Sequence, residues 1–158
     1  MNRLVKHLVF ALLSVCSAAF AAGDVSSSAD AGASADPVLA ATQAAFAKKD
    51  WAAAQSGLQK ALAGSPQNAD YHNLYAYSIR KGANPDMALV FKHYGEALRL
   101  NPKHRGAHEY VGEAYLMVGD LAKARQHLAA LDKLCFMPCE EYTDLKKAIA
   151  AYEARRKP

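Results

Sequence analysis

Cys135 and Cys139 are the residues of this sequence best suited to covalent chemistry. They stand four residues apart at the end of a predicted helix, where their Cα atoms would lie roughly 6 Å apart, within the range that a disulfide spans. We therefore predict a structural disulfide. Two alternatives stay open: a pair of thiols that exchanges disulfides, and a soft copper site that also uses Met137. The C-x3-C spacing and the neighbouring acids Glu140 and Glu141, which oppose a thiolate, weigh against exchange.

The histidines offer a second candidate for chemistry. His104 and His108 stand four residues apart, a spacing at which two imidazoles of one helix can share a metal ion. His104 precedes the predicted helix, however, and its neighbours Lys103 and Arg105 would repel a cation. His72 and His108 also occupy equivalent positions in two repeated segments. We therefore predict packing roles for these histidines, and we predict no metal site and no cofactor.

Polar residues on two predicted helices form the candidate binding site. Their spacing places them on matching helix faces: Asn73, Tyr77, Arg80, Lys81, Glu109 and Glu113. In the first interpretation this face binds an extended peptide. Asn73 pairs with the peptide backbone and Tyr77 stacks on it, while the two basic residues hold a carboxylate. In the alternative interpretation the face is solvated, and its basic residues pair with the two glutamates.

Catalytic motifs are missing from the sequence. It contains no G-x-S-x-G motif, no glycine-rich phosphate loop and no H-E-x-x-H motif. The nine glycines lie mainly at predicted turns, where a positive φ is readily adopted. We therefore predict that the protein is not an enzyme.

The N-terminal segment has the three parts of an export signal. Arg3 and Lys6 precede an apolar run over residues 8–20, and a small-x-small cleavage site ends at Ala21. A run of 13 residues is too short to span a membrane, which takes about 20. We therefore predict a periplasmic protein whose signal peptide, residues 1–21, is cleaved near Ala21. The mature chain is predicted to have no transmembrane segment.

A lipoprotein anchored through Cys16 is an alternative, although the bulky Val15 departs from the usual lipoprotein motif. Loss of the signal removes two basic residues, so 17 basic residues face 15 acidic ones in the mature chain. This near balance excludes a nucleic-acid partner. Residues 22–36 are rich in Ala, Ser, Gly and Asp and predict a flexible linker.

Apolar residues at helical spacing predict three helix pairs and a final helix after the linker. The predicted helices cover residues 38–48, 51–62, 71–81, 85–100, 105–118, 121–134 and 139–156. Two of them have an expected start signal, in which an N-cap residue precedes a proline at the first helical position. These signals are Asp36-Pro37 and Asn84-Pro85.

The three pairs repeat in register. Ala54, Ala61 and Pro66 are spaced by seven and five residues, and the same spacing recurs at Val90, Ala97 and Pro102. The repeats then cover residues 35–68, 69–104 and 105–138. This period of about 34 residues with helix-turn-helix content resembles the tetratricopeptide repeat (TPR) family. The best matches are in the third repeat, at Gly112, Tyr115 and Ala124, and in the second, at Tyr94, Ala97 and Pro102.

The sequence departs from the TPR pattern in each repeat. The first has Thr42 and Ala45 where the family has Gly and Tyr, the second has two extra residues in its turn, and the third lacks the closing proline. The family's full set of carboxylate-binding residues is also absent.

The resemblance implies an all-α fold over residues 37–156: a right-handed superhelix of three TPR-like helix pairs with a capping helix at 139–156. In such a fold the first helix of each pair lines a concave groove. It further implies a non-enzymatic periplasmic scaffold that binds a protein or peptide in that groove, within an envelope assembly or transport complex. The alternative function is a small periplasmic thiol-redox or copper-handling protein that uses Cys135 and Cys139.

Overall fold

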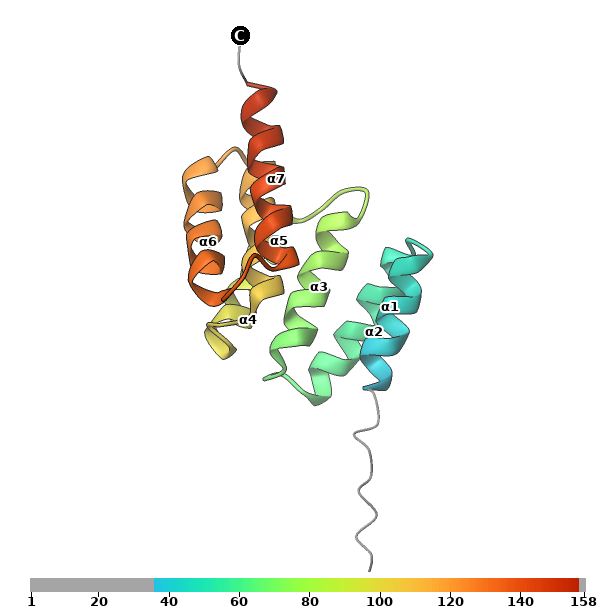
Figure 1. Ribbon diagram of the computed structural model, residues 1–158. Coiled ribbons are helices and arrows are strands. Elements are labelled where there is room, and N and C mark those ends of the chain that lie inside the picture. Colours follow the sequence, from blue (N-terminus) through green and yellow to red (C-terminus); the bar gives the residue numbers. More distant parts are fainter. Residues whose placement is uncertain (1–35, 157–158) are drawn as a thin grey trace, which may run out of the picture. The chain divides into compact units, whose positions relative to one another are not determined.

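The structure is a computed structural model in which residues 36–156 are described. The predicted signal peptide, Cys16 and all of the predicted linker except Asp36 lie outside these residues. Every regular element in the described range is a helix, which confirms the predicted all-α class (Figure 1). The helices are α1 (Pro37–Ala47), α2 (Trp51–Gly64), α3 (Ala69–Lys81), α4 (Met87–Leu100), α5 (Arg105–Met117), α6 (Leu121–Leu134) and α7 (Glu140–Ala154).

Each helix packs against the next one along the chain, and the odd-numbered helices also contact one another. α1 contacts α3, α3 contacts α5, and α5 contacts α7, whereas the even-numbered helices make no such contacts among themselves. The odd-numbered helices therefore form one row through the helical unit. A hydrogen bond supports the contact between α1 and α3: the hydroxyl of Tyr71 on α3 donates to the carboxylate of Asp36, the N-cap of α1, at 2.7 Å.

Aspartate side chains cap four of the helices. Asp36 accepts hydrogen bonds from the backbone N–H groups of Val38 and Leu39, and Pro37 occupies the first turn, as predicted. The predicted cap of α4 is wrong, because its N-cap is Asp86 rather than Asn84. Asp86 accepts from the Leu89 N–H at 3.0 Å, so Pro85 lies before the helix. A carboxylate also interacts favourably with the positive end of the helix dipole, which favours the start at Asp86.

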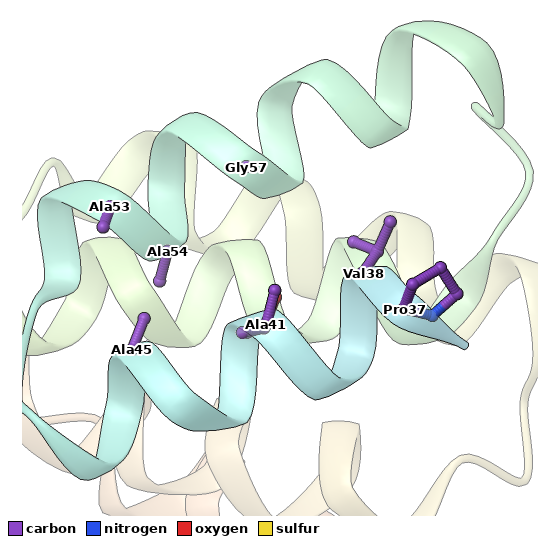
Figure 2. A pocket seen from close by; sticks show the side chains of 8 residues that line it. Pro37, Val38, Ala41, Ala45, Ala53, Ala54 and Gly57 are labelled. Atoms are coloured by element: carbon purple, nitrogen blue, oxygen red, sulfur yellow. The ribbon is translucent and has the colours of Figure 1, made fainter. Parts of the chain in front are cut away.

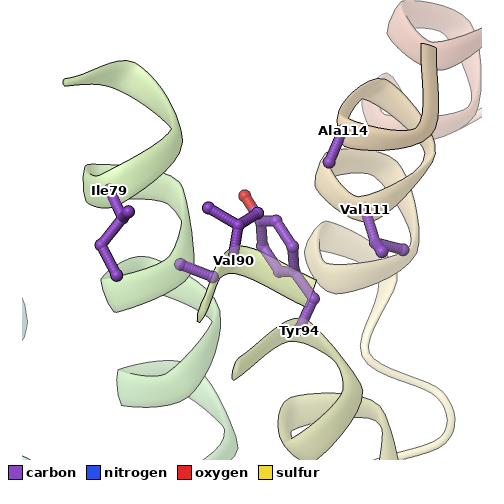
Figure 3. Close-up of a cluster of buried hydrophobic side chains, with 6 residues drawn as sticks. Ile79, Val90, Tyr94, Val111 and Ala114 are labelled. Carbon is purple, nitrogen blue, oxygen red and sulfur yellow. The ribbon is translucent and has the colours of Figure 1, made fainter. Parts of the chain in front are cut away.

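Two apolar clusters hold the second half of the unit together. The first joins α3, α4 and α5 around the fully buried Val90 and Tyr94 (Figure 3). The second joins α6 and α7, where Leu131 and Leu145 are fully buried. Burial of each such leucine stabilises the fold by about 1.5–3 kcal/mol relative to an exposed one. α7 therefore packs against the apolar side of the α5–α6 pair.

Gly112 allows α5 and α7 to approach each other closely. A Cβ atom at this position would lie 2.6 Å from Cδ2 of Leu145, closer than real Cβ contacts. Gly119 has a different role, since it adopts a φ of 84° in the turn between α5 and α6. The two glycines of the repeat with the best TPR match are thus needed for packing and for the turn.

Candidate functional site

A polar pocket of about 370 Å³ lies between α3, α5 and α7. Its lining combines five acidic side chains with a single lysine and two tyrosines: Tyr77, Lys81, Glu109, Tyr110, Glu113, Glu140, Glu141 and Asp144, together with Gly106. Four of the six predicted groove residues therefore line one pocket. The sequence did not indicate the acidic residues of α7 as site residues, because only the packing of α7 against α5 brings them to this pocket.

Arg80 lies behind this pocket rather than in it. Its side chain is 8% exposed, and its Nη2 atom forms an ion pair with Oε2 of Glu113 at 2.7 Å. Its Nε–H donates to the hydroxyl of Tyr94 at 3.3 Å. Arg80 is therefore already paired within the fold, as the alternative interpretation of this face expected. Its predicted role as a carboxylate ligand would require this ion pair to open.

Lys81 and Tyr77 form the α3 side of the pocket. Lys81 is exposed, and its Nζ atom lies 5.9 Å from the centre of the Tyr77 ring. The Tyr77 ring lies 4.7 Å from that of Tyr110, and Arg80 lies over both rings at 5.3 and 5.8 Å. These two rings therefore form an aromatic wall that already interacts with a cation.

Asn73 and Glu109 occupy equivalent positions on α3 and α5, and both are buried. Asn73 is 4% exposed, and its Oδ1 atom has no hydrogen-bond partner among the described residues. Glu109 is 9% exposed and makes no side-chain hydrogen bond or ion pair within residues 36–156. Burial and the nearby carboxylate of Glu113 raise the pKa of Glu109 to about 8. The nearby guanidinium of Arg80 offsets this penalty only in part.

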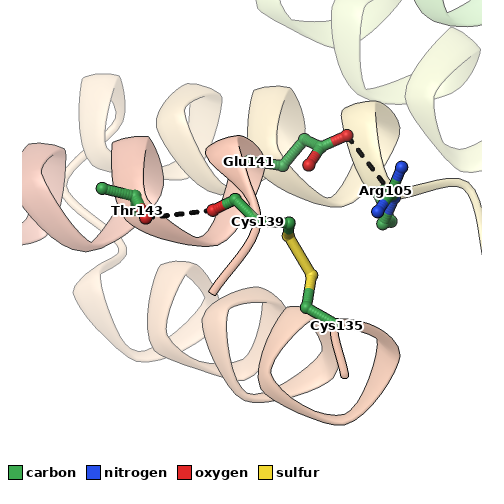
Figure 4. Close-up of a disulfide and its surroundings, with 5 residues drawn as sticks. All are labelled: Arg105, Cys135, Cys139, Glu141 and Thr143. Carbon is green, nitrogen blue, oxygen red and sulfur yellow. Dashed lines mark hydrogen bonds and ion pairs between the residues drawn. A yellow bond between two sulfur atoms is a disulfide. The ribbon is translucent and has the colours of Figure 1, made fainter. Parts of the chain in front are cut away.

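The two cysteines are joined in a disulfide between consecutive helices (Figure 4). Cys135 is the C-cap residue of α6 and Cys139 the N-cap residue of α7, and their Cα atoms lie 5.8 Å apart. This pairing agrees with the predicted disulfide. The intervening Phe136 and Met137 are exposed. Thiol exchange and copper binding at this pair stay predictions.

The histidines form two equivalent networks that each tie a helix pair together. Nε2 of His72 lies 2.9 Å from the carbonyl oxygen of Pro66, and its Nδ1 lies 2.8 Å from Nδ1 of His93. His108 makes the same two contacts with Pro102 and His127, at 3.0 and 2.9 Å. The sequence pointed to the equivalence of His72 and His108, but it did not reveal their partners, because these lie 19 and 21 residues further along the chain.

His104 has a separate structural role. Its Nδ1 atom accepts the backbone N–H of Ala107 and caps α5, while Nε2 pairs with Asp70 at 3.1 Å. It does not meet His108 at a shared ligand. Within residues 36–156, no three His, Cys, Asp or Glu side chains are arranged to hold a metal ion.

An apolar pocket of similar volume, about 370 Å³, lies between α1 and α2 (Figure 2). Small side chains line most of it, including Ala41, Ala45, Ala53 and Gly57. The pocket exists because these residues leave space between the two helices. None of the predicted site residues lies in it.

None of the described helices has the length and apolar character that crossing a bilayer requires. No known family model matches the sequence. A comparison with curated proteins also gives no significant match. The assignment of a function therefore rests on the geometry of this chain.

Proposed function

We propose that this chain is a non-enzymatic, periplasmic interaction module that binds a protein or peptide in the pocket between α3, α5 and α7. In this proposal the helix pairs form a TPR-like right-handed superhelix closed by α7. An envelope assembly or transport complex is the proposed setting. Export rests on the signal-like residues 1–21 of the sequence.

Two structural features support a repeat architecture. The networks of His72 and His108 are the same contact made twice, 36 residues apart, by consecutive helix pairs. The odd-numbered helices also form a row, which is the arrangement needed for first helices to line a common surface. Neither feature depends on the short sequence motif from which the resemblance to the TPR family was inferred.

The observation that carries the functional proposal is the composition of the pocket. Side chains of α3, α5 and α7 converge there although they come from segments up to 67 residues apart, from Tyr77 to Asp144. A pocket of this size can accommodate one or two side chains of a bound peptide. Its polar lining and its open mouth suit an extended partner better than an apolar helix.

Site-specific photocrosslinking in the cell envelope tests this proposal. A photoreactive amino acid replaces Lys81 at the pocket or, as the matched control, Lys92 on α4; both lysines are exposed. We expect a discrete crosslinked partner from position 81 and none from position 92. Crosslinks from position 92 alone would place the partner on the even-numbered helices and overturn the proposed site.

A further inference from the structure

The pocket between α3, α5 and α7 has an unused hydrogen-bond acceptor in its lining. Glu109 is more than nine-tenths buried and has no partner among residues 36–156. Asn73 at the equivalent position of α3 is also buried, and its Oδ1 atom is unpaired. Its Nδ2 atom lies 3.5 Å from where a Cβ of the lining residue Gly106 would be, so Asn73 lies beside the pocket without lining it. A largely buried carboxylate without a donor is costly, so Glu109 favours an occupant of the pocket that brings donors.

The charges around the pocket favour a cation. Three of the five lining carboxylates have a basic partner, at 2.7, 3.5 and 3.1 Å: Glu113 with Arg80, Glu141 with Arg105, and Asp144 with Lys147. Glu109 and Glu140 have none within the described residues. The raised pKa of Glu109 has the same origin, because burial and the neighbouring carboxylates penalise its negative charge. A cation beside Glu109 would offset this penalty.

The shape and walls of the pocket favour an organic cation over a metal ion. A volume of about 370 Å³ is far larger than a bare ion needs, and the described acidic groups form no cluster that could hold a metal ion. Tyr77 and Tyr110 supply aromatic faces, against which a planar guanidinium stacks well. A guanidinium also brings N–H donors in a fixed fork, which suits bidentate pairing with a carboxylate.

We infer that the pocket recognises the guanidinium of an arginine side chain on the bound peptide, with the carboxylate of Glu109 as its acceptor. This inference rests on the proposed function and names the chemical class of the partner. It assigns Lys81 a different role from the predicted one, because an ammonium group at the pocket mouth competes with the incoming cation. Arg80 stacks on the rings of Tyr77 and Tyr110 and does not contact the ligand.

The test uses three blocked seven-residue peptides of glycine and serine. Their central residue is arginine, its neutral isostere citrulline, or glutamate. Binding to the isotope-labelled protein is followed through the NMR shifts of the Gly106 and Glu109 amides. We expect the arginine peptide to bind at least about ten-fold more tightly than the citrulline peptide, since each such factor corresponds to ~1.4 kcal/mol. Equal binding of these two peptides would overturn recognition of the charge.

Three variants localise the effect. Glu109→Gln should weaken arginine binding at least five-fold, whereas Glu96→Gln on α4, outside the pocket, should leave it unchanged. Lys81→Ala, at an exposed position, should strengthen it. For the unmodified protein, affinity should rise between pH 6 and pH 9 as Glu109 ionises, and Glu109→Gln should abolish this rise. The charged and titratable groups around Glu109 are the other pocket-lining side chains and Arg80: Tyr77, Lys81 and Arg80 of α3, Tyr110 and Glu113 of α5, and Glu140, Glu141 and Asp144 of α7.

The possible failures are distinguishable. If the glutamate peptide binds at the Gly106 and Glu109 amides and the arginine peptide does not, the guanidinium inference is overturned while the proposed binding function stands. If none of the peptides shifts these amides and photocrosslinking at position 81 traps nothing, both are overturned. Unchanged arginine binding in Glu109→Gln, with its helical circular dichroism intact, would also overturn the inference.

Discussion

The close contact between Gly112 and Leu145 supports a sharp prediction about stability. An added methyl group at Gly112 would lie 2.6 and 2.8 Å from the two Cδ atoms of Leu145, which is fully buried against α6. Overpacking of this kind typically costs about 1–3 kcal/mol. Replacement of glycine by alanine inside a helix also stabilises it by about 1 kcal/mol. For Gly112→Ala we therefore expect a net change between no effect and a loss of about 2 kcal/mol.

A matched substitution separates the two effects. Gly95 lies inside α4, and a Cβ atom there would meet nothing within 4 Å. Gly95→Ala should therefore show only the gain in helix propensity. The two alanine variants should differ by about 1–3 kcal/mol in their free energy of unfolding. Urea unfolding followed by circular dichroism at 222 nm measures this difference, which corresponds to a shift of roughly 3–12 °C in Tm.

A double-mutant cycle then identifies the clash. Leu145→Ala should cost about 2–5 kcal/mol in the original chain. It should cost less in the Gly112→Ala background, because the new methyl group fills part of the space that the leucine leaves. Two results would refute the reasoning: equal stabilisation by Gly112→Ala and Gly95→Ala, or an equal cost of Leu145→Ala in both backgrounds.

Three further predictions follow from the site and its surroundings. The pKa of Glu109 rises from 4.5 to about 8 on folding, so its contribution to stability is lost as pH rises through that range. In urea unfolding, Glu109→Gln should have the same free energy of unfolding as the original protein at pH 5 and a value about 2–5 kcal/mol higher at pH 9. Parallel pH curves for the two proteins would contradict this. His72 should be the Nε2–H tautomer, because its Nε2 atom faces the carbonyl oxygen of Pro66, which can only accept a hydrogen bond. His93 should then carry its proton on Nδ1 and donate it to Nδ1 of His72. His93 should also remain neutral at pH 5.5, since burial and His72 lower its pKa to about 4. Nitrogen-15 NMR of the imidazoles checks both, and the opposite tautomers would be inconsistent with the network. Replacing Cys135 and Cys139 by serine should lower the free energy of unfolding by about 2 kcal/mol with unchanged helicity. Equal stability would show that the disulfide between α6 and α7 does not constrain the unfolded chain.

Much of the secondary structure could be predicted because the signals are local. Asp36 and Pro37 mark the start of α1 through contacts that span only three residues. The spacing of Cys135 and Cys139 likewise limits the distance between them. The start of α4 was misplaced by two residues for the same reason. Asn84 and Asp86 are both competent caps, and the sequence alone does not show which side chain reaches an N–H group.

The candidate site could be predicted only in part. Helical spacing placed Tyr77 and Lys81 on one face of α3, and both line the pocket. The state of Arg80 could not be predicted, because its burial and its ion pair with Glu113 depend on how α3 packs against α4 and α5. Glu140 was identified only as a neighbour of the cysteines, since nothing local indicates that α7 packs against α5.

The sequence by itself determined the helical segments and the cap of α1, because each depends on spacing and on short-range hydrogen bonds. Tertiary structure decided the character of the pocket. Burial left Oδ1 of Asn73 without a donor, and packing paired Arg80 with Glu113 rather than with Glu109. The face of α3 that carries Arg80 and Lys81 is basic in the sequence, but in the fold it borders an acidic pocket formed with α5 and α7. Charge compensation is a property of neighbours in space, so only the fold could reveal it.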